Sequence, residues 1–108
     1  MTHTDLHKVR GYLATLQSIL AKSQAGWATE ESLLEFRRLC WAALLVADDS
    51  ECQEQIDLLV QYSKDLFSER DRAELLRDRI RTTLGSFGAR LNGIERGYGK
   101  RWRDLRAA

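Results

Sequence analysis

Proline is absent from the 108-residue sequence, and cysteine occurs only twice. A chain without proline that is rich in leucine, alanine, arginine and glutamate favours helices along its whole length. Two cysteines are too few for the disulfide framework of a small secreted domain. No apolar run approaches the roughly 18 residues of a membrane span, and the N-terminus lacks the basic and then apolar order of a signal peptide. We therefore expect one cytoplasmic helical domain over residues 1–108, without a membrane span.

The charges and glycines that are present are unevenly distributed. The net charge of +1 combines an acidic region, with 6 Lys or Arg and 10 Asp or Glu in residues 1–66, and a basic region, with 11 and 6 in residues 67–108. Five of the seven glycines fall between residues 85 and 99. A basic segment over residues 84–108 suits contact with nucleic acid, an acidic protein or a membrane surface.

Apolar residues recur at helical spacing in four segments, which predicts helices over about 4–23, 29–47, 50–66 and 69–105. We expect Thr29 to cap the second helix, and Ser50 with Gln53 to form a capping box at the start of the third. In the first segment the inward-facing residues are expected to be Leu6, Val9, Leu13, Leu16 and Leu20. The predicted fold is all-α, a small four-helix bundle with an extended C-terminal helix.

The fourth segment is too long for its neighbours. A helix over 69–105 measures about 55 Å at 1.5 Å per residue, against about 25–30 Å for each of the other three. We therefore expect its second half to extend beyond the bundle with an uncovered apolar stripe, which a partner would cover. The predicted interface residues are Phe87, Leu91, Ile94, Tyr98, Trp102 and Leu105. A basic rim of this interface, able also to contact phosphate, is expected from Arg90, Arg96, Lys100, Arg101, Arg103 and Arg106.

The glycines leave two arrangements open for this segment. Each glycine costs about 1 kcal/mol in a helix interior relative to alanine, so the helix could break near residues 97–99 and fold back. Alternatively the helix is continuous, and small residues spaced every four positions form a strip that another backbone can approach closely. That strip consists of Gly85, Ala89, Gly93 and Gly97.

The residue patterns of known enzymes and metal sites are not matched. His3 and His7 are spaced as metal ligands on a helix can be, but a zinc site needs more ligands than these two. Glu54 and Asp57, with Glu31 and Glu35, resemble the magnesium-binding carboxylates of helical nucleotide pyrophosphohydrolases. Both pairs lie opposite the apolar faces of their helices, however. We therefore expect no catalytic residues, metal or cofactor.

These observations favour a non-enzymatic interaction protein that binds a protein partner, or itself as a homodimer, through the C-terminal amphipathic helix. Bacterial secretion chaperones, anti-activators and phage-encoded inhibitors share this build, an analogy of architecture alone. The alternative is an accessory subunit that holds nucleic acid on the basic C-terminal surface. Tyr98 and Trp102, if unwound at the glycines, would then be free to stack on bases.

Overall fold

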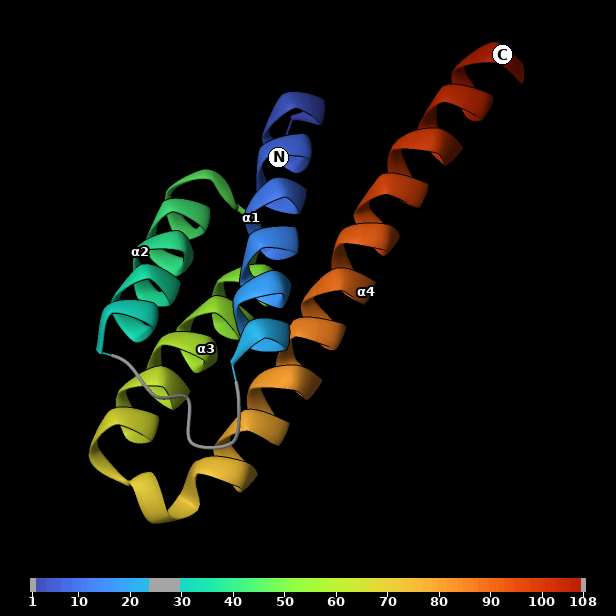
Figure 1. Ribbon diagram of the computed structural model, residues 1–108. Helices are drawn as coiled ribbons and strands as arrows, with labels where there is room; N and C mark the ends of the chain where they lie inside the picture. Colours follow the sequence, from blue (N-terminus) through green and yellow to red (C-terminus); the bar gives the residue numbers. More distant parts are fainter. Residues whose placement is uncertain (1, 24–29, 108) are drawn as a thin grey trace.

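The computed structural model describes residues 2–23 and 30–107, with the side chains of these residues except at 70 and 98–107. Four α-helices follow one another: α1 (His3–Lys22), α2 (Glu30–Val46), α3 (Ser50–Ser68) and α4 (Ala73–Ala107). Consecutive helices run in opposite directions, and α1 and α4 close the bundle by packing against each other (Figure 1). The predicted all-α bundle is confirmed.

The starts of the helices depend on capping side chains and on one short turn. At α1, Thr2 and Asp5 form a reciprocal capping box. At α3 the N-cap is Asp49, whose carboxylate accepts from the Cys52 amide at 3.1 Å, so the predicted Ser50 box is wrong. The fourth helix begins at residue 73 instead of 69 because Arg70–Arg72 forms a short 3₁₀ turn, η1. The predicted cap at Thr29 lies outside the described residues.

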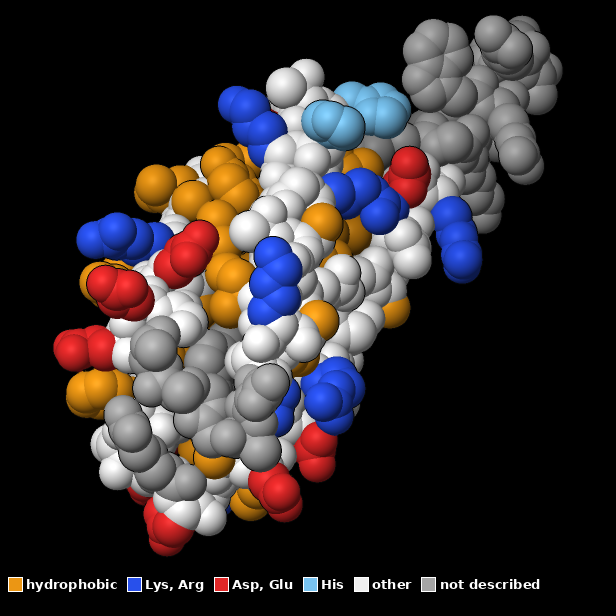
Figure 2. Space-filling view, in the orientation of Figure 1, with side chains coloured by type: hydrophobic (Ala, Val, Ile, Leu, Met, Phe, Trp, Pro, Cys, Tyr) orange, Lys and Arg blue, Asp and Glu red, His pale blue; other side chains and the backbone are white. Residues whose placement is uncertain are grey.

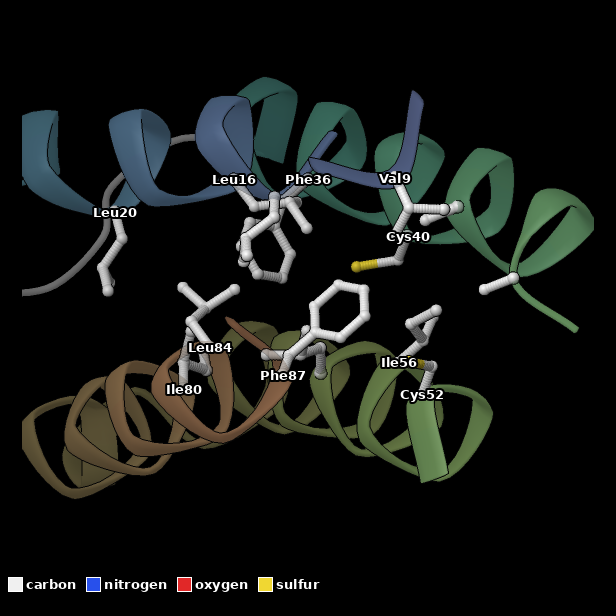
Figure 3. Packing of buried hydrophobic residues seen from close by; sticks show 14 of the residues in the cluster. Val9, Leu16, Leu20, Phe36, Cys40, Cys52, Ile56, Ile80, Leu84 and Phe87 are labelled. Carbon is white, nitrogen blue, oxygen red and sulfur yellow. The ribbon is translucent and has the colours of Figure 1, made fainter. Parts of the chain in front are cut away.

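One hydrophobic core runs through the bundle, and every helix contributes to it. All five apolar residues predicted to face inward from α1 are buried. Phe36 from α2 and Phe87 from α4 are the largest fully buried side chains. Both point into the space between α1 and α2 on one side and α3 and α4 on the other (Figure 3). The predicted inward face of α1 is therefore confirmed.

Both cysteines belong to this core. Cys40 and Cys52 are buried free thiols on the core-facing sides of α2 and α3. Burial raises the pKa of each thiol to about 12, and for Cys52 the neighbouring Asp49 carboxylate adds to the increase. At neutral pH both side chains therefore act as small apolar groups.

The last helix is continuous. α4 has 35 residues and passes through Gly97 and Gly99 without a break, so the alternative with a fold-back at these glycines is wrong. Its length of about 52 Å at 1.5 Å per residue exceeds the about 30 Å of the 20-residue α1. The molecule is accordingly elongated, with extents of 58 × 22 × 21 Å.

Candidate interaction surface

The register between α1 and α4 determines how much of α4 the bundle covers. At one end, the Arg77 guanidinium donates to the Ser23 carbonyl oxygen at 2.7 Å and so caps the last turn of α1. Near the middle, a Cβ added at Gly88 would lie 3.5 Å from a methyl carbon of Leu13. Arg77 thus lies beside Ser23, and Gly88, further along α4, lies beside the earlier Leu13. The two helices therefore run antiparallel.

Closer to the start of α1, Arg10 continues the same register. Its guanidinium donates to the Asn92 side-chain oxygen at 2.8 Å and pairs with Glu95. If the same antiparallel register continues, the first turn of α1 lies beside roughly residue 98 of α4. The backbone of α4 then continues as helix past the end of the bundle (Figure 1). This projecting end, residues 98–107, is about 15 Å long at 1.5 Å per residue.

The projecting end begins later than the sequence predicted, which corrects part of the expected interface. Phe87 and Leu91 are fully buried in the core, and Ile94 is half-buried against it. They are covered because α4 begins four residues later than expected and α1 packs beside it as far as the contacts of Arg10 with Asn92 and Glu95. The side chains of Tyr98, Trp102 and Leu105 lie outside those described. Of the predicted anchors, only these three lie on the projecting end.

Arg90 is the second correction, because it belongs to the fold and not to a free basic rim. Its Nε and Nη2 donate to the two carboxylate oxygens of Asp49 at 3.0 and 2.6 Å, and Glu51 lies 3.4 Å from Nε. This two-pronged hydrogen bond holds the pKa of the Asp49 carboxyl well below its usual range and raises the pKa of Arg90. The pair joins the start of α3 to the middle of α4. The sequence does not predict this ion pair, because it does not show which residues of α3 and α4 lie side by side.

The remaining basic residues of the predicted rim lie on the projecting end or directly before it. Arg96 is exposed, two residues after Ile94, which packs against the core. Lys100, Arg101, Arg103 and Arg106 follow on the helical backbone, and their side chains lie outside those described. In the space-filling view, basic and acidic side chains are interspersed over the face of the bundle that is visible (Figure 2).

The strip of small residues faces away from the bundle. Gly85, Ala89, Gly93 and Gly97 are all exposed, and a Cβ added at any of the three glycines would meet nothing within 4 Å. Packing within the chain therefore does not require glycine at these positions.

A face of α2 was not singled out from the sequence. Trp41 and Leu45 are exposed on the side opposite the core, together with Leu34. The available signal was the unbroken apolar run over residues 39–47. Nine consecutive apolar residues are more than one face of a helix holds, so part of the run has to point outward.

The grooves formed by the described residues are shallow, and their side chains are not arranged as in a catalytic site. The groove between α1 and α4, of about 490 Å³, is lined partly by Arg77, Arg81 and Leu84. No three His, Cys, Asp or Glu side chains in this part of the chain are placed to hold a metal ion. None of the helices, over the described residues, is long and apolar enough to cross a membrane.

Comparisons with protein-family models, with curated proteins and with solved structures find no match to this chain.

Proposed function

We propose that this protein is a non-enzymatic helical interaction protein, of chaperone, anti-activator or inhibitor type, whose projecting α4 end binds a protein partner or a second copy. The observation that carries the proposal is the continuation of α4 as one helix to Ala107, well past its contacts with α1. An isolated helical segment of about ten residues is marginal in water and gains stability when a partner covers its apolar face.

The sequence of the projecting end supports a protein partner. Helical spacing places Tyr98, Trp102 and Leu105 in line with Ile94, which packs at the edge of the core. Large aromatic side chains of this kind commonly dominate the energetics of protein interfaces. The surrounding Lys and Arg residues favour a partner with acidic groups at the edge of its groove.

The test compares the intact 108-residue chain with a Trp102→Glu, Leu105→Glu variant in affinity capture followed by sedimentation of each captured complex. We expect the intact chain to form a stable complex with a defined partner, or with itself, and the variant to lose it. Leu91 is unsuitable for this test because it is buried and its substitution would perturb the core. An intact protein that binds nothing and sediments as the variant does would contradict the proposal.

Nucleic-acid binding is the second candidate, favoured by exposed Arg96 and the four basic residues that follow on the same helix. Binding through phosphate contacts weakens steeply with added salt, whereas an apolar helix contact persists. A fluorescence titration with single- and double-stranded DNA and RNA at low and high salt separates the two candidates. Absence of binding at low salt would eliminate this one.

A further inference from the structure

Leu58, near the middle of α3, is a 44% exposed leucine with open space on two sides. Two shallow hollows lie beside it, with volumes of about 530 and 460 Å³, and both are lined by Leu58 and Glu54. The first hollow lies on α3 alone and includes Asp57. The second lies between α3 and α4, where Thr83 and Ser86 form the α4 wall. An apolar side chain of another molecule can therefore reach Leu58 from either hollow.

The charged side chains around Leu58 are all acidic. Glu51, Glu54 and Asp57 line the two hollows, and none of the described lining residues is Lys or Arg. Glu54 and Asp57 belong to none of the ion pairs among the described residues, whereas Glu51 lies 3.4 Å from the Nε of Arg90. This surface, the α3 patch of Glu51, Glu54, Asp57 and Leu58, therefore favours a partner with a cation beside an apolar side chain.

A hydrogen-bond acceptor in the second hollow has the same preference. Gln55 lines this hollow together with Glu51 and Glu54, and its buried Oε1 accepts no hydrogen bond from the described residues. Buried acceptors in folded proteins normally have a donor. Arginine and lysine side chains carry N–H donors and no acceptor, so a cation that enters beside Gln55 would supply the missing hydrogen bond.

The projecting end of α4, residues 98–107, has the complementary composition. It carries four Lys or Arg and one Asp, whereas α3 carries four Asp or Glu and one Lys. Helical spacing places Arg101 and Arg106 on the two flanks of the stripe formed by Trp102 and Leu105. The end thus offers an apolar stripe with a cation on each side, and the α3 patch offers a leucine with carboxylates beside it.

These two surfaces cannot meet within one molecule. The α3 patch lies beside Thr83 and Ser86 of α4. Residue 98 is twelve positions further along the same continuous helix, about 18 Å away at 1.5 Å per residue. The helix does not turn back towards α3 (Figure 1). The basic end can therefore reach an α3 patch only in a second copy.

We propose that the projecting α4 end of one copy binds the α3 patch of a second copy, with Trp102 and Leu105 against Leu58 and the flanking arginines beside the carboxylates. This inference rests on the function proposed above, because it names the partner of the same α4 end. The contact joins two different surfaces, so association can continue beyond two copies. A short helix buries less than the about 1,200 Å² of stable interfaces. We therefore expect a dissociation constant of order 10 μM or weaker.

Analytical ultracentrifugation of the intact 108-residue chain over a wide concentration range measures this association. We expect concentration-dependent oligomers, and an increase of about tenfold or more in the dissociation constant for E54K/D57K, which places like charges opposite the arginines. The matched control is E31K/E35K, which makes the same change in net charge at two exposed positions of α2. It should change the dissociation constant by less than about threefold, because salt screens distant charges. Circular dichroism verifies that both variants remain helical.

Two further variants test which side of the α4 end makes the contact. R101Q/R106Q removes the cations that flank the apolar stripe, and K100Q/R103Q removes two cations from the opposite side of the helix. Both lower the net charge by the same amount. We expect the first to weaken association at least about fivefold more than the second, since short-range ion pairs are screened less than distant charges. Equal effects would mean that net charge alone attracts the copies, and would contradict the proposed docking.

A mixture of two defective variants tests whether the contact joins different surfaces. E54K/D57K keeps an intact α4 end, and R101Q/R106Q keeps an intact α3 patch. Each should be monomeric at a concentration at which their mixture forms a 1:1 complex, because one productive contact remains. A contact between two α4 ends would instead leave E54K/D57K self-associated.

Three results would overturn the inference: a monomer at all concentrations, equal effects of E54K/D57K and E31K/E35K, or no complex in the mixture. The Trp102→Glu, Leu105→Glu variant separates this inference from the function proposed for α4. If that variant loses a partner or self-association that E54K/D57K retains, the α4 end binds a different surface and only the α3 inference fails. If it loses neither, the α4 proposal fails as well.

Discussion

At the scale of single residues, Asp49 combines two structural roles in one carboxylate. It caps α3 by accepting from the Cys52 amide, and it binds the Arg90 guanidinium of α4 through both oxygens. An N-cap alone usually contributes about 1 kcal/mol. Because the same side chain also joins two helices, its removal affects both the start of α3 and the position of α4.

We predict that Asp49→Ala lowers the free energy of unfolding by at least about 1 kcal/mol, the usual value for a lost N-cap. Asp49→Asn should cost less, since asparagine caps a helix nearly as well while losing the charge. Urea denaturation at pH 7 measures both, with Asp57→Asn, an exposed α3 carboxylate, as the neutral control. Equal losses for Asn and Ala would show that the charge, and not the cap, carries the effect.

The same variants have a defined pH dependence. The pKa of Asp49 is lower in the folded protein than its unfolded value near 3.9, so the ion pair stabilises the fold fully above that value. As pH falls below about 4, this contribution declines towards the folded pKa. The stability difference between the intact protein and Asp49→Asn should therefore shrink in acid, and a constant difference would contradict the assigned role.

At the scale of helices, hydrophobic periodicity was sufficient to predict the four elements and most of their inward faces. Three of the four starts were predicted to within one residue, because polar caps and apolar stripes are local properties of the sequence. The start of α4 was not, since the η1 turn depends on how the α3 end meets the next helix. Arg90 and Leu91 were assigned to the interface because periodicity shows which face is apolar but not how far a neighbouring helix covers it.

The glycines of α4 permit a prediction at this scale. Gly85 and Gly93 lie in regular helix with open space where a Cβ would be added. Substitution of either by alanine should stabilise the protein by about 0.8–1 kcal/mol, because alanine loses less backbone freedom on forming a helix. Ala89→Gly, on the same strip, should destabilise by a similar amount. Thermal denaturation of the glycine-to-alanine variants and of Ala89→Gly measures these changes in stability. A destabilising Gly93→Ala would indicate that the added methyl group meets a neighbour.

At the scale of the whole molecule, the residues of α4 that fold the chain and those of α4 proposed to bind a partner occupy different parts of this helix. The core ends with Leu91, Ile94 packs at its edge, and the Arg10 contacts with Asn92 and Glu95 end in the same turn of α4. The basic charge is concentrated beyond this point, whereas the chain up to the end of α3 is acidic. The acidic and the basic region nearly cancel in the net charge of +1. The first belongs to the folded bundle, and the second is concentrated on the projecting helix.

This division predicts different effects of truncating two residues of the same apolar stripe. Leu91→Ala should lower the free energy of unfolding by about 2–5 kcal/mol, the range for a buried leucine. Trp102→Ala, which we place on the projecting end, should change it by less than about 0.5 kcal/mol while it weakens partner binding. Urea denaturation at low protein concentration measures the first quantity without contributions from self-association. A loss of several kcal/mol in Trp102→Ala would mean that the end of α4 folds against its own bundle, and the proposed interaction surface would then have to be abandoned.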